Sequence, residues 1–117
     1  MAFDLLHRSD FERNGNWALA RKSLGVDSFG INLVTIPAGE SIPEHDETDR
    51  DQEEVFFVLS GSPTIVVDGE RLTAPEGSFC RLDPHHKRTV ENDGDAPADV
   101  LIVSAPRESG YVAMGWA

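Results

Sequence analysis

From Phe29 onward the sequence alternates short runs of β-branched and aromatic residues with turn residues, at intervals of about ten positions. This spacing is typical of an antiparallel sandwich or barrel, so it predicts an all-β fold. The clearest turn is Asp68–Gly69, which lies between the apolar residues 65–67 and the run that begins at Arg71. A two-residue Asp-Gly turn favours the positive φ angles of a tight hairpin. We expect strands at roughly residues 29–37, 53–59, 63–68, 70–74, 78–82, 87–92 and 98–105.

The first 28 residues have a different pattern, which contains two helix signals. Ser9 and Glu12 have the spacing of a capping box. Asn16 is a suitable cap for a short helix over residues 17–24, and Gly25 would end that helix. Because 117 residues suffice for one compact core and not for two, we expect residues 1–117 to form a single domain. In that domain residues 1–28 would be a helical brace or lid.

The net charge of the chain is −11, and its ten Lys and Arg residues are scattered. No basic stripe could compensate the repulsion from phosphates, so the sequence disfavours nucleic acids and anionic membranes as partners. No apolar run approaches the roughly 18 residues that span a bilayer, and residues 1–9 lack the apolar core of a signal peptide, which favours a cytoplasmic location. Cys80 is the only cysteine, which excludes an intrachain disulfide and a Cys-rich zinc site. We expect it to be a small buried hydrophobic residue in a strand.

The strand expected at residues 53–59 would direct a carboxylate toward the protein interior. Side chains alternate along a strand, so Glu54 and Phe56 share one face while Val55 and Phe57 share the other. Both faces are largely apolar, as expected where one face lines a barrel and the other meets a second sheet or another subunit. Burying a bare carboxylate is costly or raises its pKa. Glu54 should therefore have a metal ion, an arginine or another hydrogen-bonding partner.

Two glycines and two potential ligands around this strand form a recognisable motif. Gly39 is followed after five residues by His45, and Glu54 is followed after six residues by Gly61. This spacing resembles the first motif of the cupin superfamily, in which two alternating histidines and a glutamate lie between the glycines. The resemblance covers roughly residues 29–105. It implies a double-stranded β-helix, the jelly-roll barrel of cupins, followed by a tail over residues 106–117.

The chain departs from the cupin pattern at two histidine positions. The second histidine of the first motif is replaced by an acid, which is Glu47 when counted from His45 or Asp49 when counted back from Glu54. The run 77–88 resembles the second motif, and there Arg88 holds the histidine position when counted back from Asn92. By this resemblance the strand of Arg88 converges on the same cavity as Glu54, so we expect Arg88 to be its partner.

A reduced metal site remains compatible with these residues. The candidate ligands are His45, Glu54, one of Glu47 or Asp49, and His86. His85 and His86 are adjacent and would point to opposite faces of a strand, so at most one could reach the cavity. Two histidines with one carboxylate would suit ferrous iron, whereas one histidine with several carboxylates would favour manganese or a hard cation. The candidate cofactor is thus one divalent first-row metal (Fe, Mn, Ni or Zn). The alternatives are a solvated acidic loop around His45, exposed turn histidines, and a surface position for Arg88.

Three classes of function follow. In the first, a small polar molecule binds in an apolar barrel cavity through Glu54, Arg88, Phe56 and His45. In the second, a metal-dependent enzyme of the dioxygenase, isomerase or cyclase type uses a cation held by His45 and Glu54; without a metal, these two residues could act as an acid–base pair. In the third, the barrel is a structural or regulatory module. A homodimer is expected, because small cupins usually pair their sheets and the 53–59 strand has two apolar faces.

Overall fold

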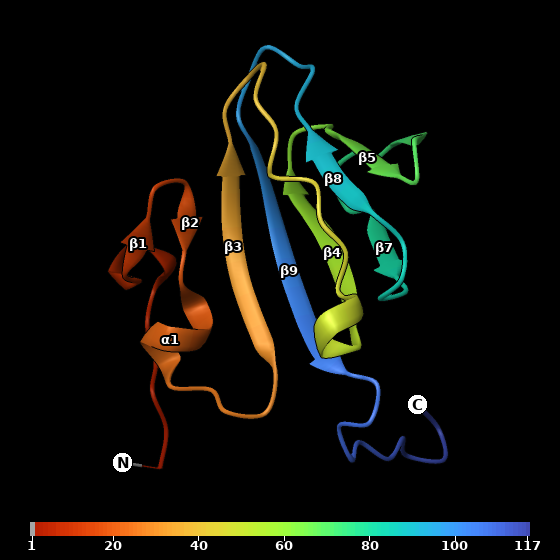
Figure 1. Ribbon diagram of the computed structural model, residues 1–117. Coiled ribbons are helices and arrows are strands. Elements are labelled where there is room, and N and C mark those ends of the chain that lie inside the picture. Colours follow the sequence, from red (N-terminus) through yellow and green to blue (C-terminus); the bar gives the residue numbers. More distant parts are fainter. Residues whose placement is uncertain (1) are drawn as a thin grey trace.

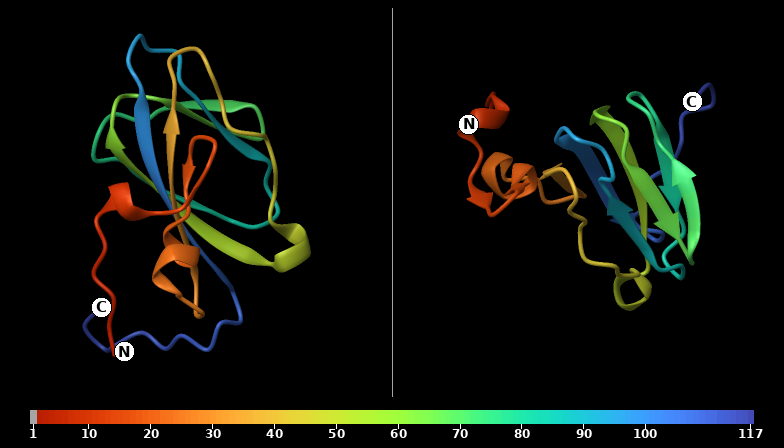
Figure 2. Two further views of the ribbon diagram at one scale, coloured as in Figure 1. Left: turned by 90° about the vertical axis from the view of Figure 1, so that its left-hand side faces the viewer. Right: turned by 90° about the horizontal axis from the view of Figure 1, so that it is seen from above.

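The computed structural model describes residues 2–117 and consists of two antiparallel sheets that pack face to face (Figure 1, Figure 2). The larger sheet contains, in spatial order, β1 (Arg13–Asn14), β2 (Trp17–Ala18), β3 (Gly30–Ile36), β9 (Ala98–Pro106), β4 (Gln52–Ser60) and β7 (Phe79–Leu82). The smaller sheet contains β6 (Glu70–Thr73), β5 (Thr64–Val67) and β8 (Arg88–Glu91). This arrangement is a jelly-roll barrel, and it confirms the all-β prediction. Each predicted strand is present, with ends that differ by at most one residue.

The turn between β5 and β6 has the geometry that its sequence favours. Asp68 has a φ angle of 49° and Gly69 one of 82°, so both central residues adopt the left-handed region. The register then places Val67 opposite Glu70. Consecutive left-handed residues are typical of the tight hairpin turn whose twist matches that of the strands. This turn holds the Asp68 carboxylate over the loop before β8, where it accepts a hydrogen bond from the backbone N–H of Lys87 (3.0 Å).

The core lies between the two sheets. Phe56 and Val58 of β4 have no exposed surface, and Glu54 on the same face is 6% exposed. They pack with residues from β3 and β9 of the larger sheet and from β5 and β8 of the smaller sheet, among them Val34, Ile36, Ile65, Val90 and Val100. The predicted alternation along β4 is therefore confirmed. Its consequence is that Glu54 enters the interior from a strand that is flanked on both sides, by β9 and β7.

The N-terminal segment differs in part from the helix expected at residues 17–24. Trp17 and Ala18 form β2 and pair with Val34 and Leu33 of β3, so the helix α1 begins only at Ala20 and ends at Leu24. Sheet pairing has overridden the local helix preference at the first two positions. Gly25 ends α1 in the left-handed conformation, as predicted (φ 71°).

The capping box predicted at Ser9 and Glu12 is wrong. The short 3-10 helix there, η1 (Arg8–Asp10), is capped instead by His7, whose side chain accepts from the backbone N–H of Ser9. Asp10 in turn accepts from the backbone N–H of His7. The structure also contains a second 3-10 helix, η2 (Thr48–Arg50), in the loop before β4. Among residues 2–117 no helix is long and apolar enough to cross a membrane.

One seam of the barrel is left open. β6 is the outer strand of the smaller sheet and β7 is the outer strand of the larger sheet, and no ladder joins them in the described residues. On the opposite side of the smaller sheet, the segment before η2 extends the sheet past β8 through isolated bridges, Ser41 with Glu91 and His45 with Arg88. These bridges fix the backbone of His45 beside the strand that carries Arg88.

Candidate functional site

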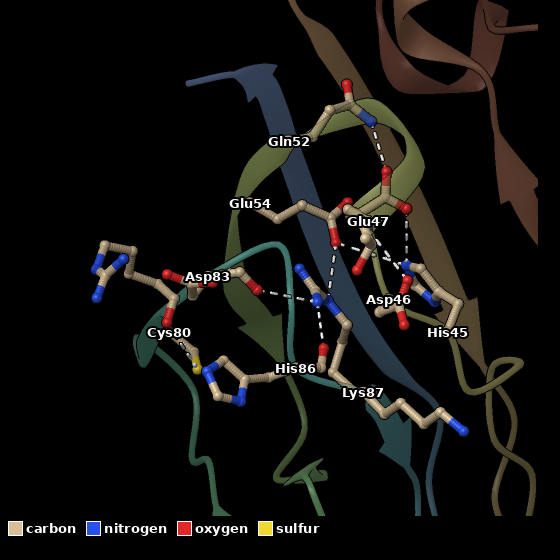
Figure 3. Close-up of polar contacts among 12 residues, drawn as sticks. His45, Asp46, Glu47, Gln52, Glu54, Cys80, Asp83, His86 and Lys87 are labelled. Atoms are coloured by element: carbon tan, nitrogen blue, oxygen red, sulfur yellow. Dashed lines mark hydrogen bonds and ion pairs between the residues drawn. The ribbon is translucent and has the colours of Figure 1, made fainter. Parts of the chain in front are cut away.

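Three potential ligands meet where the His45 segment crosses the start of β4 (Figure 3). The backbones of His45 and Arg88 exchange two hydrogen bonds of 3.0 and 2.8 Å, which place the imidazole over the inner face of β4. There His45 Nε2 lies 3.5 Å from Glu54 Oε1 and 3.5 Å from Glu47 Oε2. One ligand atom from each residue lies within 4.8 Å of the others. The predicted pair of His45 and Glu54 is thus joined by a third side chain.

The structure distinguishes between the two acids that the sequence left open. Glu47 is half-buried and lies in the cluster. Asp49 lies within η2, is exposed, and is not a member of the cluster. The reason is the turn that η2 introduces before β4, which ends at Asp51 in the left-handed conformation (φ 50°). Of the two acids, the one found by counting forward from His45 is therefore the one that lies beside it.

Each of the three residues is oriented by a second contact. His45 Nδ1 lies 3.2 Å from the carbonyl oxygen of Pro43, which can only accept, so this nitrogen carries a proton and Nε2 faces the two carboxylates. Gln52 Nε2 donates to Glu47 Oε1 over 2.5 Å. Arg88 Nε donates to Glu54 Oε1 over 3.2 Å. Outer contacts of this kind commonly fix the side chains that bind metal ions.

Arg88 is fully buried, and its guanidinium forms one wall of the site. Besides its ion pair with Glu54, Nη1 donates to the carbonyl oxygens of Asp83 (3.1 Å) and His86. Nη2 is also buried and has no hydrogen-bond partner among residues 2–117. The predicted pairing of Glu54 with Arg88 is confirmed. Because the guanidinium is always charged, it neutralises part of the negative charge of the two carboxylates.

The environment of His45 favours its protonated form. The hydrogen bond to Glu54 raises the pKa of His45, partial burial opposes this rise, and the Pro43 carbonyl and the charges of Glu54 and Glu47 add to it. The side chain of His45 is 36% exposed and that of Glu47 is 17% exposed, so the cluster is open to solvent on their side. The two carboxylates favour a positive charge between them, which is a proton on His45 or a cation.

A divalent cation fits this donor set. One imidazole nitrogen and two carboxylate oxygens are ligands that first-row metal ions accept, and three protein ligands leave positions for solvent or another molecule. Two carboxylates and one guanidinium give the site a net charge of about −1, which a divalent ion would convert to about +1. The residues therefore satisfy the requirements for a three-ligand site.

Other candidate residues lie elsewhere. His86 is not brought into the cluster, because its Nδ1 lies 2.5 Å from Asp68 Oδ2 at the hairpin turn. His85 Nδ1 lies 3.4 Å from Thr48 Oγ1, and its Nε2 lies 3.3 Å from Arg107 Nη2. Phe56 has no exposed surface, so it offers a ligand no contact area in this structure. Gln52 was missed by the sequence analysis, although the alternation along β4 places it on the same face as Glu54.

The comparisons with known proteins agree with this architecture. The model of the family described as "Cupin domain" matches residues 32–104. The chain belongs to the cupin family. A cupin protein from Bacteroides fragilis has a solved structure that is similar to this cupin with a TM-score of 0.81 and 23% identity, over 97% of this chain and 92% of that one. A predicted oxalate decarboxylase from Thermotoga maritima is similar with a TM-score of 0.74 and 19% identity, over 88% of this chain and 99% of that one.

A curated sequence relative matches this cupin over most of this chain's length. The endoribonuclease YbeY of Myxococcus xanthus is 37% identical over 106 residues, which are 87% of this chain and 33% of that protein. The chain spans less than half the length of the first curated relatives that it matches: the matched regions are 33% of one relative and 43% of the other. The similarity therefore concerns only part of those proteins.

Proposed function

We propose that this cupin binds one divalent first-row metal ion through His45, Glu47 and Glu54, and that the ion and its neighbours bind a small polar molecule. The observation that carries the proposal is the convergence of these three ligands, each held by a separate outer contact. One nitrogen with two carboxylates favours manganese, ferrous iron or a similarly hard ion over soft ones. The bound molecule would coordinate the ion through oxygen atoms. Oxalate, which the similar structure from Thermotoga maritima is predicted to decarboxylate, is a molecule of this kind.

Each residue of the site would have a separate role. His45, Glu47 and Glu54 would hold the ion, and the ion would supply Lewis-acid polarisation of a bound carbonyl or carboxylate oxygen. Gln52 and Arg88 position the two carboxylates. The buried Arg88 also maintains a positive charge beside Glu54, which favours an anionic group in the neighbouring position. His45, the most exposed of the three ligands, marks the side from which solvent and small molecules reach the site.

The experiment that tests the proposal is the metal content of the protein, measured by mass spectrometry after purification without a chelator or an affinity tag. Variants E54Q, E47Q and D49N are prepared in the same way. We expect about one divalent ion per wild-type chain and its loss in E54Q and E47Q, because an amide is neutral and a poor ligand for a hard cation. D49N is the matched control, since Asp49 is a nearby acid outside the cluster, and it should retain the ion.

A wild-type protein that remains metal-free when manganese, iron, nickel and zinc are supplied would contradict the proposal. Loss of the ion in D49N together with its retention in E47Q would contradict the ligand assignment. Both results would be interpretable, because Glu47 and Asp49 lie outside the core and their substitutions leave the packing of the barrel intact.

A second candidate function is supported by the state of Arg88. Its guanidinium already provides a permanent cation at 3.2 Å from Glu54, and its Nη2 has no acceptor among residues 2–117. A site that contains its own cation could bind a small polar molecule without metal, as in the first class considered from the sequence. In that case calorimetry with small carboxylic acids would show binding to chelator-treated protein, and added metal would not strengthen it.

A further inference from the structure

A cleft of about 320 Å³ lies between α1 and η2, at the ends of β3, β9 and β4 (Figure 1). The segments that form it are far apart in the sequence. Its lining includes two arginines and three uncharged polar residues, which are Arg21, Arg50, Asn32, Gln52 and Ser104. None of the three residues of the metal cluster lines it, so the cleft is a separate feature of the surface.

The floor of this cleft belongs to the inner face of the larger sheet. Ser104 of β9 pairs with Glu54 of β4 and with Gly30 of β3. Paired residues of an antiparallel ladder point to the same side of a sheet, so the Ser104 side chain faces inward, as Glu54 does. A Cβ at Gly30 would lie 2.5 Å from Ser104 Oγ, so the glycine leaves room for this hydroxyl. By alternation along β3 and β4, Asn32 and Gln52 lie on the same face.

The two arginines of the cleft differ from most cations of this protein. Six of the ten Lys and Arg residues form ion pairs with carboxylates, and these are Arg8, Lys22, Arg71, Arg81, Arg88 and Arg107. Arg21 and Arg50 form none among residues 2–117, and Arg21 Nη1 instead donates to the carbonyl oxygen of Val26 over 3.1 Å. Asp27 is the acidic residue of the lining. Two guanidinium groups and one carboxylate therefore give the cleft a net charge of about +1.

This positive cleft lies on a chain whose net charge is −11. Such a charge repels anions from the molecule as a whole, so an anion is retained only where positive groups converge. The planar fork of N–H groups on arginine matches the oxygen atoms of a carboxylate or phosphate. The amide of Asn32 and the hydroxyl of Ser104 add neutral donors at the floor. The lining is therefore complementary to a small oxyanion.

We propose that this cleft binds a small molecule through a carboxylate or phosphate group, with Arg21 and Arg50 as the charged donors and the polar floor as a source of neutral ones. This site goes beyond the proposed function, because it contains no metal ligand. Gln52 is the side chain that the two regions share, since it lines the cleft and donates to Glu47 (Figure 3). A bound anion would therefore lie beside the group that orients Glu47, without replacing a ligand of the ion.

The test is an NMR titration of chelator-treated protein with inorganic phosphate and, separately, with malonate, at pH 7 and constant ionic strength. The guanidinium carbon resonances of Arg21 and Arg50 report binding. We expect both to shift along saturable curves with a dissociation constant in the millimolar range, while the resonance of Arg13 in β1 stays in place. The ion with the lower dissociation constant identifies the anionic group that the cleft prefers.

Two variants separate the cleft from a general effect of charge. R50Q removes one of the two forks and should weaken binding of the preferred ion about three- to tenfold. R13Q is the matched control with a nearly unchanged affinity, because Arg13 is also exposed and lies outside the cleft. The proposal is overturned if neither ion gives a saturable shift, or if R13Q weakens binding as much as R50Q. The titration uses metal-free protein, so its failure is distinguishable from failure of the proposed metal site.

Discussion

Replacing Arg88 with methionine should be among the most destabilising substitutions in this protein. The substitution keeps an unbranched side chain of similar length but removes the charge that is 3.2 Å from the 6%-exposed Glu54. At an effective dielectric constant of 20, the attraction at that distance is about 5 kcal/mol. The carbonyl oxygens of Asp83 and His86 also lose their donor, at about 0.5–1.5 kcal/mol each. Relief of the desolvation of the guanidinium offsets part of the loss, so we expect a decrease in the free energy of unfolding of about 3–5 kcal/mol.

The assay is urea unfolding at pH 7 of chelator-treated protein, so that a bound ion does not contribute to stability. R81M is the matched control, because Arg81 of β7 and Glu53 of β4 form an exposed ion pair of 3.1 Å. An exposed pair contributes about 0–1 kcal/mol, so R81M should have a small effect. The double variant R88M/E54L should recover much of the stability that R88M loses, because it leaves no uncompensated charge. If R88M costs no more than R81M, the buried ion pair does not have the role assigned to it.

Three further predictions concern the core, the N-terminal segment and assembly. F56A should lower the free energy of unfolding by about 3–5 kcal/mol in a denaturant titration, because Phe56 is fully buried between the sheets. A decrease below about 1 kcal/mol would contradict the packing described for this side chain. Burial raises the pKa of Asp99, but hydrogen bonds from Thr35 and Arg8 outweigh this effect and lower the pKa below 3.8. The difference in unfolding free energy between wild type and D99N should therefore be complete above pH 3.8 and vanish as the pH falls through the native pKa. A difference that persists in acid would refute this prediction. We also propose a homodimer through the outer face of β4 and β7, where Phe79 is 74% exposed and its ring centroid is 4.3 Å from that of Phe57. Light scattering should give the mass of two chains for wild type and of one chain for F79S. A monomeric wild type would contradict the proposed dimer.

The fold could be predicted from the sequence because its signals are local. The Asp68–Gly69 turn and the alternation along β4 each depend on residues that are close in the chain, and the structure has both. The N-terminal segment was only partly predictable. Trp17 and Ala18 have no local signal for a strand, and their pairing with β3 brings together residues far apart in the sequence.

The site was predictable where it followed strand periodicity and not where it followed loops. The inward orientation of Glu54 could be derived from the alternation along its strand, and that of Arg88 was implied by the resemblance to the second cupin motif. Glu47 lies in a loop, and only the η2 turn determines that it, rather than Asp49, approaches His45. His86 could not be assigned from the sequence, because its partner Asp68 lies in a hairpin turn that reaches it only in three dimensions.

The most direct test of the cation site is a manganese titration of chelator-treated protein, followed by the imidazole nitrogen resonances of its four histidines in NMR. A paramagnetic ion broadens only the nuclei near it. The site described above predicts that the His45 resonances broaden first, before one equivalent is added, while those of His7, next to the Arg8–Asp99 ion pair at the far end of β9, persist. Broadening of the His7 resonances ahead of those of His45, or no broadening of His45, would contradict the assignment of the metal centre.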